Sequence, residues 1–160
     1  MSKLPKPEVA HILILGSVVA IISATSIGAL SQIIGRKPTF LLIGVVNIIA
    51  LPLLYLHLAH LTAYRDVIGP ALLITFLGNA GYAPITIFLN ERFPTALRAT
   101  GTGVSWNLGF AIGGTMPFLV SLLSGSIGGL APTLASFCAA LYLVLVLGAL
   151  VVPETRGRLQ

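Results

Sequence analysis

A row of hydrogen-bonding side chains runs along one face of an apolar segment in the middle of the chain. Its members follow one another at spacings of four, three, four and four residues: Thr75, Asn79, Tyr82, Thr86 and Asn90. In a helix this spacing places them on the same side. Polar groups within an apolar segment need partners or water. Two interpretations stay open. The row lines an aqueous cavity and contacts a solute, which we favour, or it makes hydrogen bonds between helices.

A proline within the row bears on this choice. Pro84 lacks a backbone N–H, so the carbonyl one turn earlier is left free, which is tolerated mainly where water or neighbouring protein satisfies it. This favours the cavity.

Trp106 and Asn107, near the start of the next apolar segment, are further candidates for contact with the solute. The alternative for Trp106 is an anchor in the aromatic belt at the membrane surface.

Enzyme chemistry is not supported by the remaining polar residues. The four carboxylates all lie at the ends of apolar segments, so no buried acid pair exists for metal binding, proteolysis or proton relay: Glu8, Asp66, Glu91 and Glu154. Ser105 and His57 lie on different segments, roughly 20 Å apart across the membrane, which is beyond the reach of base catalysis. His57 and His60 have no firm third ligand. We predict that the chain is not an enzyme and has no cofactor or metal site.

The composition indicates that lipid is the solvent of this chain. Of its 160 residues, 56% are hydrophobic and only 8% are charged, and the mean hydropathy is +1.02. A water-exposed surface needs about a quarter of its residues charged. The net charge of +5 forms no basic stripe, because the charges stand singly or in pairs between apolar runs. We therefore predict no nucleic-acid partner.

The positions of the charges divide the chain into spans. Charge-free intervals cover residues 9–35, 38–64, 67–90 and 99–153. About 20 helical residues cross the hydrocarbon layer, so the first three intervals hold one span each and the last holds two, separated by a Gly- and Ser-rich turn at 124–129. We predict an all-α, polytopic membrane protein with a single membrane domain over 1–160. Its five helices lie near residues 10–34, 39–59, 67–89, 101–123 and 132–152.

The distribution of Lys and Arg predicts the orientation. One side of the membrane carries basic residues at 36–37, 92–98 and 156–158, and the other has Arg65. The side richer in positive charge is cytoplasmic. This places the C-terminus inside and the N-terminus outside, in a plasma membrane such as the bacterial or archaeal inner membrane. Lys3 and Lys6 conflict mildly with this orientation, as expected if the chain lacks a preceding helix.

The predicted helices differ in character. The segments 41–58 and 134–152 are almost wholly aliphatic, so we expect them to face lipid. The first helix carries a stripe of small residues that would let another helix approach closely: Ser17, Ala20, Ala24, Gly28 and Ser31.

Three segments at predicted cytoplasmic helix ends carry motifs. They read GALSQIIGRKP at 28–38, ERFPTALRATG at 91–101 and PETRG at 153–157. The first is similar to the loop signature G-x-L-[AS]-D-R-x-G-R-[KR], the second to F-P-T-x-x-R-x-x-G, and the third to P-E-T-[KR]-G. Together and in this order they resemble the major facilitator superfamily, in its second half. The run GTGVSWNLG at 101–109 is most similar to the metabolite:proton symporters, a branch close to the sugar porters.

The resemblance covers the whole chain and maps its helices onto family helices eight to twelve. The chain departs from the loop signature at Gln32 and Ile33, where the family has Asp-Arg. Gly28, Gly35, Arg36 and Lys37 match it.

The resemblance implies further roles for charged residues. It implies a cluster of ion pairs that stabilises one conformation of the transporter, formed by Arg36, Glu91, Arg98, Glu154 and Arg156. The alternative is that these are scattered interfacial charges of about 0 to 1 kcal/mol per pair.

The resemblance also implies a central solute site lined by family helices eight, ten and eleven. Our candidate contacts are Asn79, Tyr82, Thr86, Trp106 and Asn107. We expect the chain to be the C-terminal fragment of a secondary transporter that moves a small polar metabolite by alternating access. We expect proton coupling in the intact parent, and no activity without an N-terminal half. The alternative is a non-transporting membrane scaffold, or a split half that assembles with an N-terminal-half partner.

Overall fold

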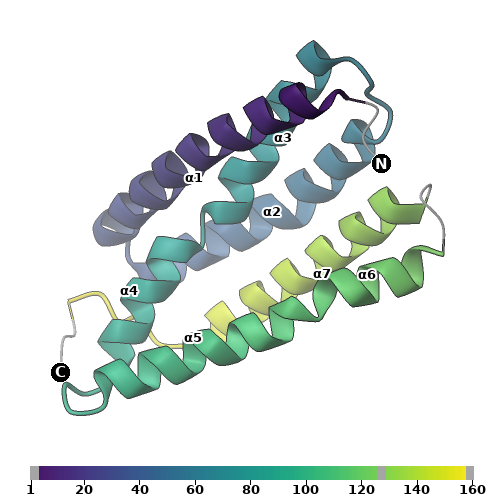
Figure 1. The fold of residues 1–160 in the computed structure, drawn as a ribbon. Helices are drawn as coiled ribbons and strands as arrows, with labels where there is room; N and C mark the ends of the chain where they lie inside the picture. Colours follow the sequence, from purple (N-terminus) through teal and green to yellow (C-terminus); the bar gives the residue numbers. More distant parts are fainter. Residues whose placement is uncertain (1–3, 126–128, 158–160) are drawn as a thin grey trace.

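The computed structural model describes residues 4–125 and 129–157, and this part of the chain is built from helices joined by short connections. Figure 1 shows them lying roughly along one direction. The helices are α1 (Lys6–Ile34), α2 (Arg36–Leu58), α3 (Tyr64–Asn79), α4 (Tyr82–Arg92), α5 (Arg98–Gly114), α6 (Met116–Ser124) and α7 (Leu130–Val151). Lys3 and residues 126–128 of the expected turn lie outside the described residues.

Five helical stretches are long and apolar enough to cross a membrane. They are Lys6–Ile34, Arg36–Leu58, Tyr64–Arg92, Arg98–Ser124 and Leu130–Val151. The prediction of an all-α chain with five spans is confirmed. The first helix begins at Lys6 rather than near residue 10, because Pro7 occupies its first turn, where a missing N–H and a fixed φ are suited to a helix start.

The third span is interrupted in its middle. One helix was expected over 67–89, but α3 ends at Asn79 and α4 begins at Tyr82. Pro84 is buried in the first turn of α4. Because Pro84 cannot donate to the carbonyl of Ala80, the helical ladder is broken at this point.

Side chains from two neighbouring helices donate to carbonyls in the last turn of α3, next to the break. The hydroxyl of Ser23 on α1 donates to the Phe76 carbonyl at 2.5 Å. The amide of Asn47 on α2 donates to the Leu77 carbonyl at 3.1 Å. Both side chains are fully buried. The break in the span is therefore stabilised by the surrounding protein, as an apolar solvent requires.

The fourth span is also divided, where one helix was expected over 101–123. At Thr115 the backbone N–H bonds to the carbonyl three residues earlier rather than four. Pro117 follows in the first turn of α6. A tightened turn followed by proline ends one helical segment and starts the next.

The second helix buries one side and exposes Val45, Ile49 and Leu53 on the other, so the expectation that it faces lipid is wrong for its inner side. It packs against α7, α3, α1 and α4, and its buried face includes Phe40, Ile43 and Leu51. At Gly44 a Cβ atom would lie within 3 Å of Val146 on α7. An aliphatic composition did not distinguish the two environments, because the interior of this bundle is as apolar as lipid.

The seventh helix faces lipid on one side alone. Val144, Leu147 and Val151 are exposed, whereas the opposite side packs against α2 and α6. The expectation that the whole segment faces lipid is therefore wrong for its inner side.

The small residues of α1 are buried along a face turned slightly from the predicted stripe. The buried positions are Gly16, Ser23, Gly28 and Ser31, and Ser17 is exposed. A Cβ added at Gly28 would lie 2.9 Å from the Ala83 Cβ on α4. The absence of a side chain at Gly28 therefore sets how closely α1 and α4 approach.

Candidate functional site

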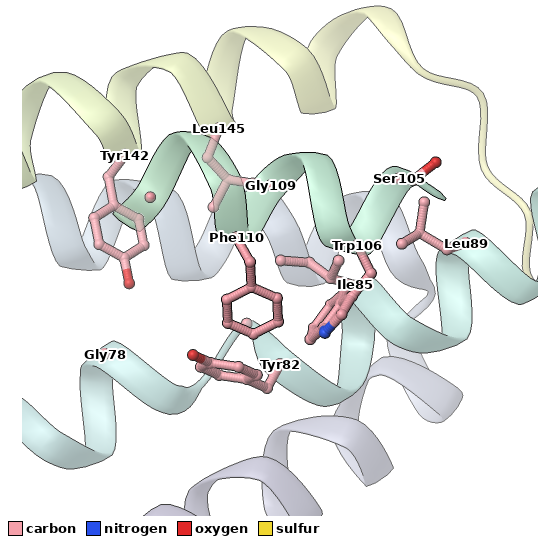
Figure 2. Close-up of a pocket in the computed structure, with 12 residues that line it drawn as sticks. Gly78, Tyr82, Ile85, Leu89, Ser105, Trp106, Gly109, Phe110, Tyr142 and Leu145 are labelled. Atoms are coloured by element: carbon pink, nitrogen blue, oxygen red, sulfur yellow. The ribbon is translucent and has the colours of Figure 1, made fainter. Parts of the chain in front are cut away.

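A cavity of about 500 Å³ lies between α4, α5 and α7, beside the break in the third span. Figure 2 shows its side chains converging from these helices. Its lining is aromatic, aliphatic and glycine-rich: Gly78, Gly81, Tyr82, Ile85, Leu89, Ser105, Trp106, Gly109, Phe110, Gly113, Tyr142 and Leu145. The volume is within the range of small-molecule sites.

Three aromatic rings form a continuous wall of this cavity (Figure 2). The rings of Tyr82 and Trp106 have centroids 5.8 Å apart and planes at 67°. Those of Trp106 and Phe110 are 5.5 Å apart at 77°. Both pairs are edge-to-face, the arrangement that the charge distribution of aromatic rings favours. The wall joins α4 to α5.

Glycines form the other part of the wall. A Cβ added at Gly78, Gly109 or Gly113 would meet no other atom within 4 Å. Backbone is therefore exposed to the open space at these positions, and each of them has room for a larger residue.

The five predicted solute contacts are divided between two environments. Tyr82 and Trp106 line the cavity. Asn79, Thr86 and Asn107 are not part of its lining, and each donates to the backbone carbonyl four residues earlier in its own helix at 2.8 Å. Thr86 and Asn107 are also exposed. A polar row on a membrane helix can thus be satisfied within that helix.

Two aromatic lining residues were not predicted. Phe110 stands four residues after Trp106, so a search for aromatic pairs at helical spacing would have found it. Tyr142 is a tyrosine within an otherwise aliphatic segment, and its polar hydroxyl is the signal that this segment does not face lipid all round.

A second cluster lies at the far end of the bundle, where α1, α2 and α4 meet the C-terminal segment. Arg36, at the start of α2, is 2% exposed. It makes a bidentate ion pair with Glu91, through Nε to Oε2 at 3.0 Å and Nη2 to Oε1 at 2.6 Å. The Ser31 hydroxyl and the Gln32 side-chain carbonyl accept two more of its five N–H groups at 3.0 Å. Gln32 therefore still binds the cluster where the family signature has an acid.

The C-terminal segment completes this cluster through Thr155 and Glu154. The Thr155 hydroxyl donates to Glu91 Oε2 at 2.8 Å. Glu154 accepts four backbone N–H groups at 2.9 to 3.0 Å, from Arg36, Lys37, Thr155 and Arg156. Burial acts to raise the pKa of Glu154, but these backbone donors outweigh it and hold the pKa below its usual value. The Glu154 carboxylate thus caps the N-terminus of α2.

The connection between α1 and α2 is a single residue that fits against this carboxylate. Gly35 has φ 103°, a conformation that side-chain-bearing residues rarely adopt. A Cβ there would lie 2.6 Å from Glu154 Oε2.

The other predicted cations make hydrogen bonds of their own. Lys37 Nζ donates to the Leu150 carbonyl near the end of α7 at 2.8 Å. Arg98 donates to the Thr95 hydroxyl at 3.4 Å. Arg156 contributes its backbone N–H, and its side chain is exposed. Within residues 4–125 and 129–157, no three His, Cys, Asp or Glu side chains are grouped to hold a metal ion.

Comparison with known proteins identifies the family. The sequence model for "Sugar (and other) transporter" matches residues 3–159. The chain belongs to this family of transporters. The match confirms the resemblance to major facilitator transporters.

Curated relatives of this chain are named as transporters. A probable 4-methylmuconolactone transporter of Cupriavidus pinatubonensis is 37% identical over 128 residues, 80% of this chain and 29% of the relative. A putative metabolite transport protein of Haemophilus influenzae is 29% identical over 140 residues, 82% of this chain and 31% of the relative. Sialic acid transporter NanX of Escherichia coli is 37% identical over 78 residues, 48% of this chain and 19% of the relative.

The chain thus spans less than a third of the length of these transporters. No solved structure gives a significant match. The family and the apolar helices together make this a multi-pass membrane protein of a small-molecule transporter family.

Proposed function

We propose that the chain forms part of the C-terminal half of a secondary active transporter that moves a small polar metabolite by alternating access. Its spans correspond to family helices eight to twelve, five of the six helices of that half. The observation that carries the proposal is the cavity between α4, α5 and α7. A solute site at a broken helix within the membrane is the general arrangement of such transporters.

The orientation that we propose follows from the charged end of the bundle. Arg36 and Arg98 begin α2 and α5, whose starts lie at the end of the bundle opposite the start of α1 (Figure 1). Lys37 and Arg156 share the Glu154 carboxylate with Arg36 through their backbone N–H groups. By the positive-inside rule this end is cytoplasmic, and the membrane is the plasma membrane, in a bacterium or archaeon the inner one.

We further propose that the cluster around Arg36 holds one conformation of the transporter. Three separate segments meet there through hydrogen bonds to Glu91 and Glu154. Separating this buried charge pair would leave both charges unpaired in an apolar medium, which favours the conformation in which they are joined.

Proton coupling, in our proposal, belongs to residues outside this chain. Glu8 and Asp66 lie in the first turns of α1 and α3, Glu91 ends α4, and Glu154 follows α7. No carboxylate among the described residues lines the cavity.

The experiment that tests this function is complementation between chains. The full chain is co-expressed with the segment of the Cupriavidus relative that it does not cover, and cellular uptake of labelled 4-methylmuconolactone and of sialic acid is measured. We expect saturable uptake of one of them with both chains present and none with either alone. Uptake by this chain alone would contradict the proposal that it needs an N-terminal half. No uptake from the two well-expressed, co-purifying chains would overturn the transport proposal.

A further inference from the structure

The cavity between α4, α5 and α7 has a shape and lining that select among solutes. We propose that it binds a planar, unsaturated ring, an aromatic ring or a conjugated ring of similar size, in preference to a saturated one. This inference rests on the proposed function, in which the cavity is part of the solute site.

The aromatic wall is the first reason. Tyr82, Trp106 and Phe110 form an unbroken edge-to-face series, so their faces and edges point in alternating directions along the wall (Figure 2). A flat π-system in the cavity can extend the series by one more edge-to-face or offset contact. A puckered saturated ring has no π-system and is limited to C–H contacts with the aromatic rings.

The glycine wall is the second reason. Gly109 and Gly113 lie one turn apart on α5 and line the cavity, and a Cβ added at either would meet no other atom within 4 Å. Two glycines one turn apart leave a strip of backbone without side chains. A flat molecule can lie against such a strip at van der Waals distance. The cavity thus has aromatic rings along one wall and glycine backbone along another.

The charge of the lining is the third reason. Within the described residues, no lysine, arginine, histidine, aspartate or glutamate lines the cavity. A carboxylate or ammonium group placed there would be desolvated without a counter-charge, at high cost. The cavity therefore takes the uncharged ring of the solute, and a charged substituent of that solute must project out of it.

One polar contact at the cavity fits an oxygen substituent on the ring. Tyr142 lines the cavity. A phenolic hydroxyl both donates and accepts hydrogen bonds, so a hydroxyl group on the ring can bond to it.

The test uses Trp106, the single tryptophan of the sequence, as a reporter within the cavity wall. The purified full chain in lipid nanodiscs is titrated with benzoate and with cyclohexanecarboxylate, which carry the same charge on a planar and on a puckered ring. We expect saturable quenching of Trp106 fluorescence by benzoate, with a Kd about tenfold lower than for cyclohexanecarboxylate. Equal affinities, a preference for the saturated ring, or no saturable response to either would overturn the inference.

Glycine substitutions decide whether the response comes from this cavity. Gly113→Ala places a methyl group in the cavity and is expected to weaken benzoate binding at least fivefold. Gly103→Ala, on the same helix, also has open space but lies outside the lining, so it should leave the Kd unchanged. Equal effects of the two variants would contradict the assignment of binding to the cavity. Tyr142→Phe should leave benzoate binding unchanged and remove any preference for 4-hydroxybenzoate over benzoate.

These outcomes are distinguishable from failure of the transport proposal. Uptake of sialic acid by the complemented pair, with no planar preference in Trp106 quenching, would leave the proposed function standing and overturn this inference. A tenfold planar preference without uptake by the pair would support the binding assignment and overturn transport.

Discussion

Replacing Glu91 by glutamine tests whether the buried ion pair holds the charged end of the bundle together. Glu91 accepts three side-chain hydrogen bonds, two from Arg36 and one from Thr155. Glutamine has nearly the same shape, but its NH₂ group cannot accept a bond and it carries no charge. Glu91→Gln therefore leaves the Arg36 guanidinium, 2% exposed, without a counter-charge.

The expected cost follows from that burial. Removing one partner of a buried pair costs about 3–5 kcal/mol, because the remaining charge is left uncompensated. Ser31 and Gln32 still accept bonds from Arg36 in the variant, which places the loss near the lower figure. We expect a decrease of about 3 kcal/mol in the free energy of unfolding, a factor of roughly 150 in the equilibrium.

Reversible unfolding in mixed micelles, followed by circular dichroism, measures this change. The matched control is Asp66→Asn, which removes the same charge from an exposed carboxylate at the start of α3. An exposed carboxylate contributes little, so the control should shift the free energy by less than about 0.5 kcal/mol.

A double variant separates the uncompensated charge from lost packing. In Arg36→Met with Glu91→Leu no charge is left unpaired, so it should be more stable than Glu91→Gln. Two results would refute the reasoning. One is a shift for Glu91→Gln no larger than for Asp66→Asn, and the other is a double variant less stable than the single one.

Other positions give further predictions. Gly35→Ala should lower the free energy of unfolding by about 1–3 kcal/mol through backbone strain alone, and by more through the clash with Glu154. The control Gly125→Ala is also at positive φ but in open space, and it should cost about 1–2 kcal/mol. Equal losses of unfolding free energy in the two variants would exclude the clash. Asn47→Ala should cost about 0.5–1.5 kcal/mol in the same assay, because it removes the hydrogen bond to the Leu77 carbonyl, which keeps the Ala80 N–H as a partner. Asn107→Ala, which removes an exposed bond within one helix, should cost less than about 0.5 kcal/mol, and equal losses would contradict the role of Asn47. Because the pKa of Glu154 is lower in the folded chain, its stabilisation is complete above the ordinary value of 4.5 and is lost as the pH falls through the folded-state pKa. The difference in unfolding free energy between the wild type and Glu154→Gln should therefore shrink below about pH 4.5, and a difference that is constant from pH 7 to pH 3 would show that the carboxylate charge is not involved.

The spans were predictable because charge is too costly to place within lipid. The charged residues mark the ends of helices, and the helix limits near Ile34 and Arg92 follow from them. The breaks within spans three and four were not predicted. Pro84 signalled a free carbonyl, but its consequence depends on Ser23 and Asn47 from other helices, and those contacts exist only in the folded bundle.

The candidate site was predictable in part for a related reason. Polar periodicity identified the face that carries Tyr82, which lines the cavity. The periodicity could not show that Asn79 bonds within its own helix. An asparagine at the same position in the row can donate either to a carbonyl of its own helix or to a neighbouring helix. Tyr142 was not predicted because its segment is aliphatic on both sides. Only the packing of α7 against α2 shows which side faces inward.

The one-residue connection at Gly35 has a consequence for how this transporter family can vary. Each residue of a helix turns it by about 100°, and α1 and α2 are separated by Gly35 alone. Inserting or deleting one residue there would rotate every later position of α2 by that angle relative to α1. Arg36 would leave Glu91, and Asn47 would leave the Leu77 carbonyl. This connection should therefore be constrained in length as well as in the identity of Gly35, whose positive φ and contact with Glu154 disfavour a side chain.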